Sequence, residues 1–389
     1  MAPSLHAAAE KRKSQLGTLE TTAEVAVAVL RGVPGKSSNR PTTVGFDKAQ
    51  ERQSGWNIYE PKTVSLLDPM HKRCSRHMND RSREIYAVGG GKGGTGKSFV
   101  TANLGVLLAQ QGKKVLLVDL DLGASNLHTF LTVKKPQVGL REYLSKEVVD
   151  LNDTAIPTVE PNLSLISSIG CSLEIANLYY AQKIKIIKAI RNLPYDFILL
   201  DLGSGTHFNT IDFFLIDNQG FLVTTPEPSS IENMFRFIKS IYLRKLRNTI
   251  KEHGFRTIFH EAINTYRDLE ITTTTDLLRL FKDHDSNMGE EIEKKVADFN
   301  FMIILNHFRN QIDVNFGSQI AKVCNRHLYF NYEFIDNVTF DSRVSDSILN
   351  NQVFVRKYGY TKTALELKRI ARKVMENSTE PINSLSLAS

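Results

Sequence analysis

The residue pattern best suited to chemistry is a glycine-rich run with two lysines, GGGKGGTGKS at residues 89–98. Its core fits the phosphate-binding pattern G-x-x-x-x-G-K-[ST] through Gly91, Gly96, Lys97 and Ser98. Glycines let consecutive backbone N–H groups curl around phosphate oxygens, and a following helix presents its positive end. The lysine would neutralise the β- and γ-phosphates, and the hydroxyl would ligate Mg²⁺. The run therefore predicts a nucleoside triphosphate site with bound Mg²⁺.

Three aspartates follow apolar runs and are candidates for metal and water chemistry. Asp119 and Asp121 come near the end of KVLLVDLDL at 114–122, and Asp201 comes near the end of YDFILLDLG at 195–203. An isolated aspartate at a strand end is more often a turn former. Three of them downstream of a phosphate loop favour a shared site, because ligands bind at the carboxyl ends of parallel strands.

The elements that must position these residues alternate along the chain. Short apolar runs are separated by helical patterns, and they lie at 85–90, 114–122, 162–169, 195–203, 220–228 and 299–306. Strands that are continuously apolar are buried on both faces. The sequence therefore predicts an α/β fold, a doubly wound and mostly parallel sheet flanked by helices.

Three other regions frame this predicted domain, which covers residues 84–376. Residues 1–83 mix Ser, Thr, Pro and Gly with scattered charge and predict a mostly unstructured leader with one short helix near 19–31. A charged, helix-patterned stretch at about 243–298 is too long for one crossover and predicts a helical insertion. Residues 377–389 form a polar tail after a helix predicted at 361–376.

Composition excludes several classes of protein. The 389 residues are 41% hydrophobic and 23% charged, without an apolar run long enough for a transmembrane helix. Three scattered cysteines do not suggest a disulfide scaffold. Of the net charge of +7, residues 1–84 contribute +5, so the rest of the chain is close to balanced. We therefore expect a cytoplasmic protein.

The segment KGGTGKS at 92–98 resembles the deviant phosphate loop of the MinD/ParA family of ATPases. In that family a signature lysine reaches across a nucleotide-sandwich dimer to the partner's phosphates, and the resemblance gives this role to Lys92. The alternative is a solvated loop lysine. LLVDLDLGASNLH at 116–128 resembles the family's switch segment, and LLDLGSG at 199–205 resembles its Walker B strand. Many relatives have Thr-Pro-Ala where this chain has Leu-Gly-Ser at 202–204, and a glycine there still allows close backbone approach.

The resemblance implies a role for each site residue. Asp119 would help to hold the Mg²⁺ shell, Asp121 would orient the attacking water, and Asp201 would bind a Mg²⁺ water. Asn306, at the end of FMIILN, matches the asparagine that contacts the base, and its alternative is a turn residue that ends the strand. The implied catalytic residues are Lys92, Lys97 and Asp121; the nucleotide contacts are Gly91, Lys92, Gly93, Gly94, Thr95, Gly96, Lys97, Ser98 and Asn306; the metal contacts are Ser98, Asp119 and Asp201.

The family resemblance covers about residues 84–375, and the segments DLGASNLH and VTTPEPSSIEN are similar to the MinD and FlhG branch. It implies a switch that dimerises with ATP, hydrolyses it to ADP and phosphate with Mg²⁺, and positions or counts a bacterial cell structure such as flagella or the division site. A protein partner, as activator or cargo, is also implied.

Two alternatives stay open within the same superfamily. A ParA-like, DNA-binding partition ATPase would be favoured if Arg244, Lys245, Arg247 and Lys251 formed one exposed face. An ATPase for metal-cluster assembly is disfavoured, because its carriers usually need a paired-cysteine motif.

The C-terminal helix bears on membrane contact. Leu367, Ile370, Ala371 and Val374 form a helical stripe beside basic residues. Such a stripe lies on an anionic bilayer or packs in the core, and we favour the core. Any membrane contact is then expected to be weak and peripheral, at the inner face of the cell membrane.

Overall fold

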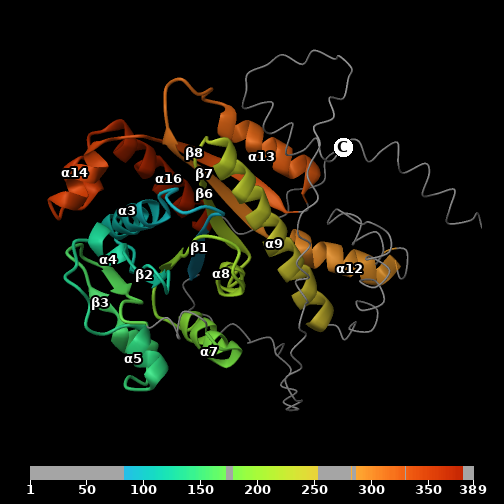
Figure 1. The fold of residues 1–389 in the computed structure, drawn as a ribbon, viewed down its shortest axis with the longest axis horizontal. Helices are drawn as coiled ribbons and strands as arrows, with labels where there is room; N and C mark the ends of the chain where they lie inside the picture. The colour runs from blue at the N-terminus through green and yellow to red at the C-terminus, as the bar shows by residue number, and fades with distance from the viewer. Residues whose placement is uncertain (1–82, 172–177, 253–281, 283–285, 329, 380–389) are drawn as a thin grey trace, which may run out of the picture.

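An eight-stranded sheet forms the centre of the computed structural model (Figure 1), which describes residues 83–171, 178–252, 282, 286–328 and 330–379. The strands are β1 (Glu84–Gly89), β2 (Val115–Leu120), β3 (Ile156–Pro157), β4 (Leu163–Ile166), β5 (Phe197–Leu202), β6 (Gln219–Thr224), β7 (Asn300–Phe308) and β8 (Asn331–Thr339). Their order is β3-β4-β2-β5-β1-β6-β7-β8, and only the β3–β4 pair is antiparallel. The predicted mostly parallel, doubly wound sheet is confirmed.

Helices cover both faces of this sheet. One core contains residues of α3 (Lys97–Gln110), α4 (Leu127–Phe130), α14 (Arg343–Leu349), α15 (Phe354–Lys357) and α16 (Lys362–Thr379). The other contains residues of α5 (Leu140–Ser145), the 3₁₀ turn η2 (Leu151–Thr154), α7 (Tyr180–Ile190), α8 (Phe208–Phe214), α9 (Pro228–Glu252), α12 (Ser286–Ala297) and α13 (Phe316–His327).

The strands read as continuous apolar runs because successive residues enter opposite cores. In β1, Ile85 and Ala87 pack in one core, whereas Tyr86 and Val88 pack in the other. A strand covered on both faces therefore loses the alternation of polar and apolar residues. Since β1, β2, β5, β6 and β7 run parallel, their carboxyl ends meet at one edge of the sheet.

The structure differs from the sequence prediction in its strands and in one helix. The six predicted apolar runs include neither β3 nor β8, the two strands at the edges of the sheet. Helix α9 is continuous from Pro228 to Glu252, so the helix that follows β6 runs into the region interpreted as an insertion. Within that region α12 is also described; most of the rest of 253–285 and the predicted leader lie outside the described residues.

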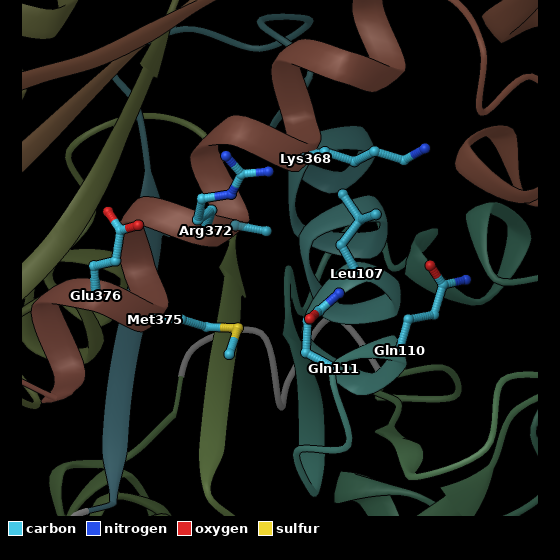
Figure 2. A pocket seen from close by; sticks show the side chains of 8 residues that line it. Leu107, Gln110, Gln111, Lys368, Arg372, Met375 and Glu376 are labelled. Atoms are coloured by element: carbon cyan, nitrogen blue, oxygen red, sulfur yellow. The ribbon is translucent and has the colours of Figure 1, made fainter.

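The apolar stripe of the C-terminal helix belongs to the core. Leu367, Ile370, Ala371 and Val374 are all buried in the layer that contains α3. Figure 2 shows α16 beside α3, where Met375 and Leu107 line a pocket of about 410 Å³ between the two helices. The favoured core interpretation is thus confirmed. Among the described helices, none is both long and apolar enough to cross a membrane.

Candidate nucleotide site

The glycine-rich loop lies between the end of β1 and the start of α3. Gly94 and Gly96 have φ angles of +79° and +86°, a region that side-chain-bearing residues rarely adopt. Gly96 is the last residue before α3, which begins at Lys97. The loop thus delivers the chain into the positive end of a 14-residue helix, where an anion is favoured.

The other glycines of the loop face two different environments, the helix α9 and open space. A Cβ on Gly91 would lie 1.9 Å from the carbonyl oxygen of Asn233 in α9, so the loop backbone packs directly against that helix. At Gly93 the nearest atom would be the Ser204 hydroxyl at 3.6 Å, and at Gly94 nothing lies within 4 Å. One side of the loop is therefore packed, and the other is open for a ligand.

Lys97 and Ser98, at the open side of the loop, interact with aspartates at the ends of the central strands. Lys97 is 8% exposed, and burial lowers its pKa, whereas the carboxylates of Asp201 and Asp121 act in the opposite direction. Ser98 forms a side-chain hydrogen bond with Asp201. The site thus holds a buried cation and a hydroxyl at the start of α3.

Asp119 and Asp201 are opposite each other on the neighbouring strands β2 and β5. Burial raises the pKa of Asp119 to about 6, against hydrogen bonds from Ser125, from the Leu127 backbone and from the Asp121 backbone. Burial and the nearby Asp119 raise the pKa of Asp201 to about 7. Two buried carboxyls that resist joint ionisation form a site that an added cation would stabilise.

Asp121 lies two residues after Asp119, directly past the end of β2. Its carboxylate accepts the Ala124 N–H at 3.1 Å, and a Cβ on Gly203 would come within 3.2 Å of its Oδ1. Gly203 therefore lies close to the Asp121 carboxylate.

Lys92 lies apart from the cavity of its own subunit. Its ammonium contacts the Glu227 carboxylate at 3.2 Å and the Ser229 hydroxyl at 3.0 Å, and its side chain is 39% exposed. Both partners belong to the turn and first residues that start α9. The trans role of Lys92 stays a prediction.

Asn306 anchors the phosphate loop. Its side-chain amide donates a hydrogen bond to the Thr95 carbonyl at 2.9 Å, and a Cβ on Gly96 would lie 2.1 Å from its Nδ2. The residue lines the cavity and is 2% exposed. A role in base contact stays a prediction.

The open side of the loop faces a cavity of about 430 Å³. Of the residues singled out from the sequence, Lys97, Ser98, Asp121 and Asn306 line it, together with Ser204 of the β5–α8 loop. Its remaining wall was not predicted from the sequence and includes Phe99, Phe130, His307, Phe340, Val344 and Ile348. Of these, Phe99 directly follows Ser98 and His307 directly follows Asn306, so both lie beside residues that the sequence singled out.

The residues present fit a nucleotide with a divalent cation. Thr95 has a buried hydroxyl without a hydrogen-bond partner beside the loop backbone, and Gly93 and Gly94 leave room for phosphate oxygens. The described residues contain no cluster of three His, Cys, Asp or Glu side chains able to hold a metal. A Mg²⁺ ion would thus depend on the Ser98 hydroxyl, on Asp119 and Asp201, and on the phosphates themselves.

Two of the four basic residues considered for DNA binding, Arg244 and Lys245, are engaged within the fold. Arg244 forms two hydrogen bonds with Asp212, at 2.5 and 2.7 Å, and Lys183 is paired with the same carboxylate. Lys245 donates to the Asn218 side chain at 2.7 Å. Arg247 is exposed, and the side chain of Lys251 lies outside the described residues. The structure therefore does not support one exposed basic face formed by this set.

The sequence is similar to a known protein family and to several characterised proteins. Residues 86–354 match the model of the CobQ/CobB/MinD/ParA nucleotide binding domain. The septum site-determining protein MinD of Helicobacter pylori is 30% identical over 186 residues, which are 46% of this chain and 66% of that protein. The chain thus spans just under two thirds of this relative. The antiactivator FleN of Pseudomonas aeruginosa is 22% identical over 297 residues, 75% of this chain and 86% of its own.

Comparison with solved structures concerns the fold. The septum site-determining protein MinD of Pyrococcus horikoshii, solved in complex with Mg-ADP, superposes with a TM-score of 0.53 at 21% identity. The match covers 77% of this chain and 98% of that one. The shared architecture therefore includes nearly all of the smaller protein.

Proposed function

Because this chain belongs to the CobQ/CobB/MinD/ParA nucleotide-binding family, we propose that it is a Mg²⁺-dependent ATPase whose ATP-bound form dimerises as a switch. One observation carries this proposal. The phosphate loop has two lysines, and only Lys97 lines the cavity of its own subunit, whereas Lys92 lies at the surface on Glu227 and Ser229. This position supports the proposal, because a lysine at the surface beside the cavity could reach the phosphates of a second copy.

The proposed chemistry assigns a task to each group. Backbone N–H groups of Gly93 to Ser98 bind phosphate oxygens, and Lys97 neutralises their charge. Ser98, Asp119 and Asp201 hold the cation, and Mg²⁺ bound there would neutralise charge that develops on the transferring phosphoryl group. Asp121 positions water for attack on the γ-phosphate, and Lys92 of the second copy stabilises the same charge. Hydrolysis to ADP and phosphate then opens the dimer.

We further propose that this switch controls the position or number of a cell structure and acts on a protein partner. The support is the extended similarity to FleN, which is named an antiactivator, and to MinD, which is named for determining the septum site. The partition alternative has less support, because Arg244 and Lys245 are bound to other residues of the fold.

Light scattering on purified Asp121→Ala protein tests the switch. If Asp121 positions water, this variant keeps ATP and accumulates as a dimer, but stays monomeric with ADP. Asp153→Ala, an exposed carboxylate on η2, is the matched control and should release phosphate at the wild-type rate. A monomeric Asp121→Ala protein in saturating ATP would contradict the proposal.

The same samples separate the two cellular roles. Mixed with anionic liposomes, the ATP dimer is expected to float weakly or not at all, because the apolar stripe of α16 is buried. Mixed with nonspecific duplex DNA, it should show no shift. A DNA shift that needs ATP and disappears steeply with salt would favour the partition role instead.

A further inference from the structure

A further cavity, a groove of about 280 Å³, lies between α9 and α13, outside the nucleotide site. Ile231 and Phe235 of α9 and Phe316, Ile320 and Val323 of α13 line it. Ile231, Phe316 and Ile320 are buried, whereas Phe235 and Val323 remain partly exposed. The groove therefore presents an apolar surface to solvent.

Two cations border this surface. Lys322 and Arg326 lie four residues apart on α13, so they are on the same face of the helix. Both are exposed, and neither has a hydrogen-bond or ion-pair partner among the described residues. Among the described residues that line the groove there is no carboxylate, so the charge of this described lining is positive.

The groove is built on rigid supports. A Cβ on Gly317 would lie 2.1 Å from the Phe334 ring, so α13 packs closely against β8. On the other side, Ile231 is two residues from Asn233, whose carbonyl contacts Gly91 of the phosphate loop. A ligand in the groove would thus lie against the same turn of α9 that supports the loop.

We propose that this groove docks an amphipathic helix of a partner protein, with apolar side chains on the groove floor and acidic side chains against Lys322 and Arg326. Charge complementarity selects this occupant, because a helix with carboxylates four residues apart matches the spacing of the two cations. The inference names a partner surface and goes beyond ATP hydrolysis and dimerisation.

Two synthetic helical peptides of about 16 residues, long enough to be partly helical alone, test the proposal. Both carry leucines at i, i+3, i+4 and i+7; one carries glutamates beside them and the other lysines. Binding to the full chain is measured by fluorescence anisotropy in ADP. The acidic peptide should bind, and the basic one should not.

Variants then locate the binding surface. Val323→Asp should weaken the acidic peptide at least tenfold, because it places a charge in the apolar floor. The double change Lys322→Glu and Arg326→Glu should weaken the acidic peptide tenfold and bind the basic one. Lys188→Glu, an exposed lysine on α7, is the matched control and should change neither affinity. Binding of a fluorescent ADP analogue confirms that each variant is folded.

Three results would overturn the proposal: equal binding of both peptides, an acidic-peptide affinity that Val323→Asp leaves unchanged, or the failure of the charge swap to exchange the preference. A dimer in ADP that Val323→Asp dissociates would also overturn it and make a second copy the occupant. Since the assay uses ADP, its outcome does not depend on hydrolysis. If the peptide binds while the Asp121→Ala protein stays monomeric in ATP, the docking proposal is supported and the proposed ATP-dependent dimer is rejected.

Discussion

The two lysines of the phosphate loop lie five residues apart but in different surroundings. Lys97 is buried against Asp201 and Asp121, whereas Lys92 is at the surface on Glu227. In the glycine-rich run itself both are positive charges near phosphate, and only the family resemblance gives them different roles. The fold separates them into one that serves its own site and one that faces outward.

Substitution should therefore separate binding from catalysis. We expect Lys92→Ala and Lys97→Ala each to slow phosphate release by at least about 100-fold, the scale for losing one preorganised charge. Only Lys97→Ala should also weaken binding of a fluorescent ADP analogue, because Lys92 does not line the cavity. Lys188→Ala serves as control. A wild-type hydrolysis rate in Lys92→Ala would show that the lysine is merely solvated.

The paired carboxyls predict a dependence of stability on pH. The pKa of Asp201 is raised to about 7 in the folded protein, so the folded state keeps a proton that the unfolded chain releases near pH 4. Its contribution to stability is then greatest below pH 4 and is lost as pH rises toward 7. Asp201→Asn removes this ionisation, and without Mg²⁺ it should raise the Tm at pH 8.

Calorimetry of both proteins at pH 5 and pH 8 checks this expectation. A gain of roughly 1 kcal/mol corresponds to about 2–4 °C in a domain of 150–250 residues, and to a smaller shift in this larger one. The gain should shrink at pH 5, where the native carboxyl already holds its proton. Equal gains at both pH values would show that ionisation of Asp201 is not the cause. Added Mg²⁺ with ADP should stabilise the wild type more than Asp201→Asn.

At the scale of elements, the phosphate loop connects β1 to α3 and packs against α9. Gly91 and Gly93 are two residues apart and look equivalent in the sequence. Gly91 nevertheless faces the Asn233 carbonyl, whereas Gly93 faces the cavity. Their substitutions should therefore fail in different ways.

Gly91→Ala is expected to lower the free energy of unfolding by about 1–3 kcal/mol, because its Cβ would overlap backbone that cannot move freely. For Gly93→Ala, the free energy of unfolding should stay within about 0.5 kcal/mol of the wild-type value. This variant should instead bind a fluorescent ADP analogue at least tenfold more weakly, because the new methyl group occupies the space for the phosphates. Urea unfolding and nucleotide titration measure the two effects. A Gly91→Ala protein of wild-type stability would rule out the packed contact with α9.

Sequence periodicity predicted the inner strands because their burial on both faces leaves a plain apolar run. It missed β8, the edge strand NYEFIDNVT, in which polar residues such as Glu333 and Asp336 interrupt the pattern. The same limit applies to the site. The loop and the aspartates follow recognisable local spacing, whereas Phe130 and Phe340 reach the cavity from separate elements, and nothing local marks them.

At the scale of the whole molecule, α16 closes one of the two cores. It packs against α3 and is tied to β8 through Glu366, which accepts the N–H and O–H of Thr339 at 2.6 and 2.8 Å. A helix used in this way cannot also present its apolar stripe to a bilayer without opening the core.

A matched pair of substitutions on α16 tests that conclusion. Ile370 is fully buried, so Ile370→Asp should cost more than about 3 kcal/mol of unfolding free energy. Leu365, on the same helix, is 48% exposed, and Leu365→Asp should change it by less than about 0.5 kcal/mol. Urea unfolding compares them. If Ile370→Asp kept full stability and instead lost liposome binding, the stripe would be a membrane contact after all.

The length of α9 has a mechanical consequence. Its 25 residues span about 37 Å at 1.5 Å per residue, and only its first turns touch the phosphate loop. If that end is the pivot, a tilt of about 10° there moves the opposite end by about 6 Å, from this length and rise. A tilt that hardly moves the backbone at the loop glycines would therefore displace Glu252 by about 6 Å.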